Sequence, residues 1–364
     1  MPTYVNCEGN ALVYCQGAYN TTNGKTAHGL VRSTNRYNVV AVIDENYEGR
    51  DAGLVLGEPD RGIPIVSSVK GAIELAEKRK KKATHLVVGL APDGGRLPDR
   101  ARLDITEAIE ARLNIDCGLH DFLNSDYEFA RVAKKNDVVI RDIRKPPDRK
   151  ELHFFSGEID EVSCLKTAVL GTDSAVGKRT TALLLAQALA MENVEAELIG
   201  TGQTAWLQGL KYSLVMDSIV NDFVAGEIEH QIVRAWREQG PDVILLEGQG
   251  SLMNPAYPGG FELLAAGRPD VVILQHAPAR KEYDGFPGRK LHSLSRQIKA
   301  IETVSDVPVV AITVNHENLS KTQLDEAIEK IEYETGLPTC APLRQSMSPV
   351  LDVILSHMSS FDYR

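Results

Sequence analysis

The sequence predicts an α/β protein with two domains in succession, each built on a parallel β-sheet. Three observations predict this fold class. Short apolar runs of strand length alternate with helical segments along almost the whole chain, which is typical of parallel sheets covered by helices on both faces. The 364 residues exceed what a single hydrophobic core usually organises. A charged segment with two adjacent prolines divides the series of strands into two.

The N-terminal half supplies the first series of strands and helices. We expect strands at residues 38–44, 63–66, 85–90 and 138–143, and helices at 69–82, 100–113 and 125–135. The helix at 69–82 ends in a basic run, which suits a helix C-terminus. Because strands and helices alternate throughout, we expect residues 1–150 to form a Rossmann-like domain.

The second series begins after an exposed linker. Residues 144–151 combine prolines and charge without an apolar period, so we place the domain boundary near residue 150. Beyond it we expect strands at 167–170, 196–200, 243–246, 271–274 and 309–314, and helices at about 178–191, 226–239, 290–303 and 321–335. Residues 151–364 should therefore form a second α/β domain.

The second domain contains a glycine-rich motif, Gly171-Thr-Asp-Ser-Ala-Val-Gly-Lys178. It follows an expected strand and opens an expected helix, as a phosphate-binding loop (P-loop) requires. The glycines let N–H groups point inward, the helix N-terminus adds positive dipole, and Lys178 adds a charge. We therefore expect a P-loop NTPase-like domain. The expected cofactor-binding residues are Gly171, Thr172, Asp173, Ser174, Ala175, Val176, Gly177, Lys178, Arg179 and Thr180.

One position departs from the usual phosphate loop. The residue after the lysine is normally a Ser or Thr whose hydroxyl holds magnesium, and here it is Arg179. In one alternative Thr180 supplies the hydroxyl through a shifted helix start. In the other, which we favour, the loop binds a pyrophosphate without a metal and Arg179 supplies extra charge. The favoured alternative predicts no metal site.

Glu247 is an acidic candidate near the phosphate loop. It ends the apolar run Val-Ile-Leu-Leu and precedes Gly-Gln-Gly, which places it at the carboxyl end of a strand. It could act as a general base or hold a metal-bound water, and capping of the next turn is the structural alternative. Asp217 and Asp222 are weaker acidic candidates, for which we expect a structural role.

The loop after the expected strand at 271–274 carries basic side chains among turn-forming residues. Loops at the carboxyl ends of strands are where α/β proteins bind ligands. Arg280, Lys281 and Arg289 could clamp a dicarboxylate substrate. His276 has a pKa range that suits a general base. For each residue alone, a surface or packing role is an equal alternative.

Three further segments are weaker candidates. Gly24-Lys25-Thr26 resembles the end of a second phosphate loop, but Ala18 stands where the first glycine is required, so we expect no second nucleotide site. Residues 89–95 could line a cleft, although an ordinary turn is the simpler expectation. His120 and Asp121 could pair or simply lead into a helix.

Charge and composition exclude several classes of protein. The chain has 40 basic and 50 acidic residues, a net charge of −10, which argues against nonspecific binding of nucleic acid or anionic membranes. Five widely spaced cysteines argue against a disulfide framework and a zinc ribbon. We find neither a signal-peptide pattern nor an apolar stretch of about 20 residues, so we expect a cytoplasmic protein without membrane segments.

Several motifs together resemble one known family. They are Gly-Leu-His-Asp-Phe-Leu at 118–123, the phosphate loop with its continuation at 171–181, Asp-Phe-Val-Ala-Gly-Glu at 222–227, Glu-Gly-Gln-Gly at 247–250 and His-Ala-Pro-Ala-Arg-Lys at 276–281. The chain is identified as a member of a bacterial and archaeal family whose best-known members are D-glutamate N-acetyltransferases. The resemblance implies an acyltransferase that moves acetyl from acetyl-CoA to the amine of a D-amino acid, with D-glutamate as the first candidate. By analogy with similar P-loop proteins, we also expect a homo-oligomer.

The resemblance also implies roles for the candidate residues. The phosphate loop would hold a phosphate group of acetyl-CoA, and basic side chains between Arg280 and Arg289 would hold the amino acid. His276, or else Glu247, would accept the amine proton, while Lys178 or backbone N–H groups would stabilise the oxyanion.

The phosphate loop is similar to a second family as well. It resembles that of dethiobiotin synthetase, in which a threonine directly follows the lysine. An ATP- and magnesium-dependent ligase or kinase is therefore the first alternative function. A nucleotide-binding protein without turnover is the second.

Overall fold

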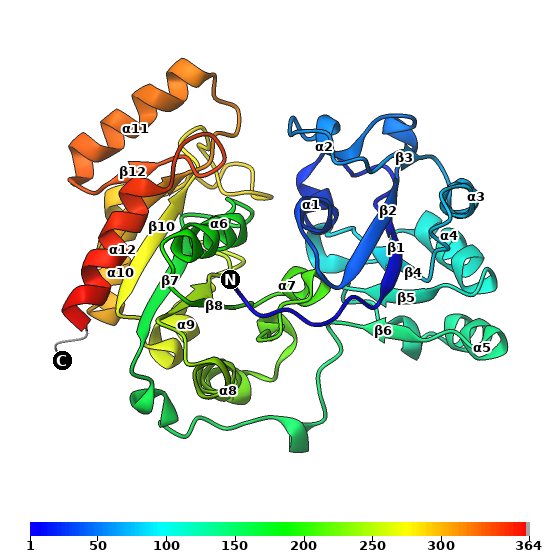
Figure 1. Cartoon of the computed structure of the whole chain (residues 1–364), viewed down its shortest axis with the longest axis horizontal. Helices are drawn as coiled ribbons and strands as arrows, with labels where there is room; N and C mark the ends of the chain where they lie inside the picture. The colour runs from blue at the N-terminus through cyan, green and yellow to red at the C-terminus, as the bar shows by residue number, and fades with distance from the viewer. Residues whose placement is uncertain (362–364) are drawn as a thin grey trace. The chain divides into compact units, whose positions relative to one another are not determined.

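The computed structural model describes residues 1–361, which form two compact units (Figure 1). One unit, called the N-terminal unit below, contains Tyr4–Pro146 together with Gly202–Lys211. The other, the C-terminal unit, contains Met1–Thr3, Pro147–Thr201 and the chain from Tyr212 onward. Each unit is built on a six-stranded sheet covered by helices. The predicted fold class is therefore confirmed.

The sheet of the N-terminal unit has the strand order β3-β2-β1-β4-β5-β6, and all neighbouring strands are parallel. Its strands are β1 (Gly9–Tyr14), β2 (Tyr37–Ile43), β3 (Ile65–Val66), β4 (His85–Val88), β5 (Asn114–Cys117) and β6 (Ile140–Asp142). Its helices include α1 (Lys25–Arg32), α2 (Ala52–Val55), α3 (Val69–Lys78), α4 (Asp99–Glu110) and α5 (Tyr127–Asn136). Figure 1 shows α1 and α2 on one face of the sheet and α3, α4 and α5 on the other. This is the doubly wound arrangement of a Rossmann-like domain.

Several elements of this unit differ from the expectation, and helix α2, for example, was not predicted. Strand β5 was not predicted, because it has only four residues and two of them, Asn114 and Asp116, are of types that are depleted in strands. Its buried Asp116 is tolerated because the carboxylate accepts hydrogen bonds from the Tyr37 hydroxyl and from Arg141. Helix α3 ends at Lys78 rather than at residue 82, since Lys80 adopts a left-handed φ of 56° that no helix can continue.

Helix α7 (Gln203–Gln208) belongs to the N-terminal unit although it follows β8 in the sequence. Figure 1 shows it beside α1, on the same face of the sheet. Leu207 is fully buried in the core of this unit, and the Arg36 guanidinium lies 3.7 Å from the ring centroid of Trp206. The Gln208 side chain donates a hydrogen bond of 2.9 Å to the carbonyl of Gly29 in α1. The downstream half of the chain thus supplies a helix that the N-terminal unit needs.

We expect Leu207→Ala to destabilise the N-terminal unit by about 2–5 kcal/mol, because it leaves a cavity in a close-packed core. Hydrogen exchange should become faster in α1 and in β1, which belong to that core, and change little in α11. A matched substitution on the exposed surface, Leu103→Ala in α4, should leave exchange unchanged. Faster exchange confined to the C-terminal unit would contradict the assignment of α7.

The sheet of the C-terminal unit has the strand order β12-β11-β10-β7-β9-β8, again with parallel neighbours throughout. Its strands are β7 (Leu165–Gly171), β8 (Ala196–Ile199), β9 (Val243–Glu247), β10 (Val271–His276), β11 (Val309–Val314) and β12 (Thr339–Cys340). Its helices are α6 (Lys178–Met191), α8 (Asn221–Gln239), α9 (Phe261–Gly267), α10 (Leu294–Ser305), α11 (Lys321–Thr335) and α12 (Ser348–Phe361). Helix α6 packs against α12, while α9 packs between α8 and α10.

Helix boundaries in this unit differ from the expectation where loops intervene. Helix α8 begins at Asn221 rather than at residue 226. Helix α10 begins at Leu294 rather than at 290, because the preceding residues form a turn and Ser293 caps the helix by accepting a hydrogen bond from the Arg296 N–H. Helices α9 and α12 and the two-residue strand β12 were not predicted. None of the helices within residues 1–361 is both long and apolar enough to cross a lipid bilayer.

Candidate functional site

The glycine-rich loop lies at the point where the strand order of the C-terminal sheet reverses. It connects the end of β7 to the start of α6. Strands β9 and β8 lie on one side of β7, and β10, β11 and β12 lie on the other. Crevices at such switch points, outside the carboxyl ends of the strands, are where open α/β sheets bind ligands. The fold therefore places the predicted loop in a ligand-binding position.

The backbone of the loop is shaped to bind an anion. Ala175 and Gly177 have positive φ values of 51° and 107°, so the chain curls tightly before α6 begins. The backbone N–H groups of Ala175, Val176 and Gly177 donate no hydrogen bond to any residue in the part of the chain that the structure describes. A curled run of N–H groups at the N-terminus of a helix attracts phosphate or carboxylate. These three N–H groups are among the donors that the loop can offer to a ligand.

Lys178 is held at the base of this loop. Its Nζ donates hydrogen bonds of 2.8 Å to the Asp173 carbonyl and 2.9 Å to the Gly250 carbonyl. Its stem passes close to Gly171 and Gly248, where an added Cβ would lie 2.9 and 3.1 Å from the Lys178 Cδ. The absence of a side chain at both glycines therefore leaves room for the Lys178 side chain.

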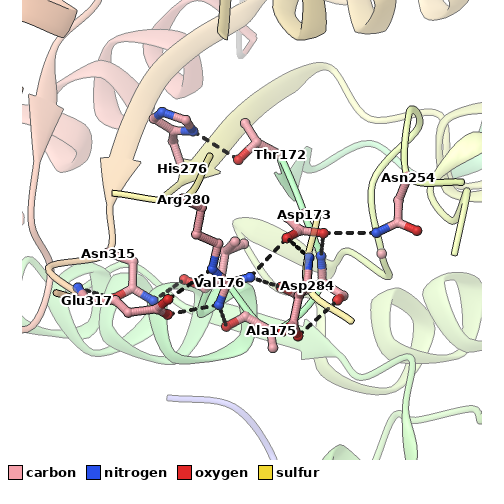
Figure 2. Close-up of polar contacts among 12 residues, drawn as sticks. Thr172, Asp173, Ala175, Val176, Asn254, His276, Arg280, Asp284, Asn315 and Glu317 are labelled. Atoms are coloured by element: carbon pink, nitrogen blue, oxygen red, sulfur yellow. Dashed lines mark hydrogen bonds and ion pairs between the residues drawn. The ribbon is translucent and has the colours of Figure 1, made fainter. Parts of the chain in front are cut away.

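The carboxylate of Asp173 is fully buried and accepts four hydrogen bonds (Figure 2). Oδ1 accepts from the Ser174 N–H at 2.7 Å and from the Asn254 amide at 2.9 Å. Oδ2 accepts from the Arg280 guanidinium at 3.0 Å and from the Asp284 N–H at 2.8 Å. Asp173 thus joins the phosphate loop to the loops that follow β9 and β10.

Arg280 also holds the phosphate loop in place. All five of its N–H groups have an acceptor: two bind Glu317, and the others bind the Asp173 carboxylate and the carbonyls of Ser174 and Ala175. Only 8% of its side chain is exposed. In this geometry all donors of the guanidinium are bound to acceptors within the protein. The predicted binding of a substrate carboxylate therefore depends on the neighbouring basic residues.

Four residues of this framework were missed by sequence reasoning. Asn254 and Asp284 bind Asp173, Glu317 binds Arg280, and the Asn315 amide donates to the Val176 carbonyl at 3.0 Å. Each lies in a loop beyond the carboxyl end of a strand, which is the only signal that the sequence carried for them.

Arg179 forms an ion pair with Glu247 at the end of β9. Its Nε donates to Glu247 Oε1 at 3.0 Å, and Oε2 of the same carboxylate accepts from the Thr201 N–H at 3.1 Å. The exposed fractions of the two side chains are 15% and 7%. Two of the predicted site residues are therefore brought together, and both oxygens of Glu247 have partners.

His276 ends β10 and lies beside the start of the phosphate loop. Its Nδ1 is 2.9 Å from the hydroxyl of Thr172, and Figure 2 shows the two side chains facing each other. Burial lowers the pKa of His276 to about 4. The ring is therefore neutral at physiological pH, so one of its nitrogens carries a hydrogen and the other is an acceptor.

Lys281 and Arg289 are exposed and lie in one turn after β10. An isolated antiparallel bridge joins Glu282 to Lys290, and the Tyr283 N–H donates to the Arg289 carbonyl. Lys281 and Arg289 therefore lie on the two paired segments of this turn, next to the residues that pair. Two neighbouring positive charges suit a dicarboxylate.

The segment around Gly24 is explained by packing in the N-terminal unit. A Cβ at Gly24 would lie 2.7 Å from the carbonyl oxygen of Tyr19, so a larger residue does not fit. Thr26 is buried, and the Ala27 N–H donates to the Gly89 carbonyl at 3.1 Å. The N-terminus of α1 is thus used in holding the loop after β4.

Asp121 has a structural role nearby, since its Oδ2 accepts from the Leu97 N–H at 2.7 Å. Within the described residues there is also no group of three or more His, Cys, Asp or Glu side chains with the geometry of a metal site.

Comparison with known proteins assigns the chain to a family. A family model described as a domain of unknown function (DUF1611), P-loop domain, matches residues 153–351, and the corresponding Rossmann-like domain model matches residues 45–146. This chain belongs to the DUF1611 family. A crystal structure of a DUF1611 family protein from Anabaena variabilis is 29% identical, with a TM-score of 0.86, covering 96% of this chain and all of that one.

Two curated relatives of this DUF1611 protein carry a functional name. A D-glutamate N-acetyltransferase from Pseudoalteromonas sp. is 31% identical over 306 residues, 82% of this chain and 90% of the relative. A D-glutamate N-acetyltransferase from Tritonibacter scottomollicae is 28% identical, over 77% of this chain and 84% of the relative. The family resemblance found in the sequence is confirmed, and this DUF1611 protein belongs to an acetyltransferase family.

Proposed function

We propose that this DUF1611 protein transfers an acetyl group from acetyl-CoA to the amine of D-glutamate. One observation of the structure carries the proposal: Asp173 joins an anion-binding loop to a basic loop. The reaction needs both, because acetyl-CoA brings phosphates and glutamate brings two carboxylates. The names of the two relatives supply the acetyl group and the acceptor.

Some residues of the site would bind the two substrates, and Arg280 would position the loops that carry them. The open N–H groups of the phosphate loop and Lys178 would hold a phosphate group of acetyl-CoA, whose negative charge they complement. Lys281 and Arg289 would hold the carboxylates of D-glutamate. Arg280 would keep the two loops in register through Asp173 and Glu317.

The reaction requires a neutral amine and a stabilised oxyanion. The amine nitrogen attacks the thioester carbon, the C–N bond forms, and the C–S bond breaks to release coenzyme A as its thiol. His276 would accept the amine proton, since the carboxylate of Glu247 is engaged by Arg179 and Thr201. A long pantetheine arm separates the phosphates from the thioester. The arm must therefore fold back toward β10 for His276 to reach the reacting end.

A thiol-release assay tests the proposed function. Purified protein would be mixed with acetyl-CoA and each of a panel of D- and L-amino acids, and free thiol would be measured. We expect release with D-glutamate and much less with L-glutamate. Absence of release with every D-amino acid would reject acetyl transfer. Magnesium-dependent ADP formation from ATP with a carboxylic acid would support a ligase or kinase, and ligand binding without any product would support a binding protein.

The pH profile gives a prediction for His276. Because its pKa is lowered to about 4, the ring stays unprotonated throughout the neutral range, so no loss of kcat with a midpoint near 6.5 should arise from it. We expect His276→Gln to lower kcat by about 10²–10⁴-fold and to leave KM for acetyl-CoA nearly unchanged. A raised KM for acetyl-CoA with normal kcat would instead show that His276 contacts the phosphate end.

A further inference from the structure

The magnesium site that a P-loop fold implies is altered in this chain. P-loop NTPases hold the ion with the hydroxyl that follows the loop lysine and with an acidic residue from a nearby strand. Here the two corresponding residues are Arg179 and Glu247, which ends β9 beside β7. The position that normally carries a neutral oxygen ligand therefore carries a positive charge.

The acidic residue is also fully engaged. Oε1 of Glu247 accepts hydrogen bonds from Nε and Nη2 of Arg179, and Oε2 accepts from the Thr201 N–H. The Thr201 hydroxyl donates to the Glu247 carbonyl at 2.9 Å, which fixes the end of β9 to the second residue after β8. The residues present do not fit a magnesium ion, because a cation would have to displace a half-buried guanidinium from a buried carboxylate.

We propose that the Arg179 guanidinium takes the place of the divalent cation, so that the loop binds phosphate without a metal. The guanidinium balances the charge of Glu247 permanently, and neither ion dehydration nor a free metal concentration enters the binding equilibrium. A hydroxyl from Thr180 would not change this balance, since Glu247 would still be paired. The ligand class is a phosphate ester or diphosphate that carries no bound magnesium. The inference depends on the charges of Arg179 and Glu247 and is independent of the identity of the acyl acceptor.

The proposal makes Arg179 a residue that acts through Glu247. Without the guanidinium, the carboxylate of Glu247 would lie uncompensated beside the loop and would repel the incoming phosphate. Replacing Arg179 by serine would then provide the pair of hydroxyl and carboxylate oxygens that magnesium prefers as ligands. Arg179→Ser should therefore convert a metal-independent site into a metal-dependent one.

Binding measurements on the full chain test this directly. Calorimetry with coenzyme A and, separately, with ADP would be run in EDTA and in excess magnesium, and Mn²⁺ binding would be followed by electron paramagnetic resonance. In the unaltered protein we expect equal affinity in EDTA and magnesium, and no site-bound Mn²⁺. In Arg179→Ser the affinity in EDTA should fall by about tenfold or more and recover with magnesium, with one Mn²⁺ bound in the presence of ligand.

Two further variants complete the cycle. Arg179→Ser combined with Glu247→Gln removes the repulsion, so affinity in EDTA should recover and magnesium should have no effect. Arg179→Lys keeps the positive charge, so its ligand binding should remain metal-independent. This variant tests the role of the charge if Arg179→Ser does not fold. A tenfold loss of affinity in EDTA in the unaltered protein, or a stoichiometric Mn²⁺ in it, would overturn the proposal. Binding of ADP but not of coenzyme A would reject acetyl-CoA as the cofactor while leaving the metal-free loop in place.

Discussion

Asp173→Ala should abolish measurable acetyl-CoA binding and lower the free energy of unfolding by about 3–5 kcal/mol. The substitution removes all four acceptor contacts of a fully buried carboxylate and leaves the Arg280 guanidinium with less negative charge around it. The phosphate loop would lose its ties to the loops after β9 and β10. Both losses should appear together, because the same contacts shape the loop and stabilise the fold.

Calorimetric binding of acetyl-CoA and urea denaturation measure the two effects. Glu282→Gln is the matched control, since it removes an exposed acidic side chain from the neighbouring turn. That control should change stability by less than about 0.5 kcal/mol. Normal acetyl-CoA affinity in Asp173→Ala would show that the loop keeps its shape without the four contacts.

Lys178→Ala should separate binding from stability. We expect the affinity for acetyl-CoA to fall by about 10–100-fold, because a charged hydrogen bond to a phosphate oxygen is lost. The free energy of unfolding should fall less than in Asp173→Ala, by about 1–2 kcal/mol, because two hydrogen bonds from Nζ to carbonyl oxygens are lost.

The same two measurements apply, with Lys281→Ala as the control. Lys281 is exposed and belongs to the proposed acceptor site, so its removal should leave acetyl-CoA affinity intact. A large loss of stability in Lys178→Ala, comparable with that of Asp173→Ala, would mean that the lysine has a structural rather than a ligand-binding role.

Local patterns were sufficient to predict the fold class and the position of the phosphate loop. A strand, a glycine-rich turn and a helix are consecutive in the sequence, so the motif at 171–178 carries its own context. Short elements with mixed polarity were missed, as β5 illustrates with its buried Asp116. Such a strand is stable because of partners distant in sequence, which no local window contains.

The contacts that shape the site were harder to predict for the same reason. Asp173 is joined to Asn254, Arg280 and Asp284, which lie 81 to 111 residues downstream. The sequence identified Arg280 as a residue of interest, yet nothing in it indicated that Asp173 and Glu317 would occupy the guanidinium. Similarly, the charge of Arg179 was evident, but its pairing with Glu247 followed only from the order of the strands.

Helix α7 has a consequence for how the protein is made. A ribosome releases residues 1–146 first, yet the sheet they form receives one of its covering helices only when residues 203–208 have emerged. Until then, the surface that Leu207 later buries is open to chaperones and to other nascent chains. Completion of the N-terminal unit must therefore wait for translation of β7, α6 and β8 of the C-terminal unit, so it is finished while the rest of the C-terminal unit is still being made.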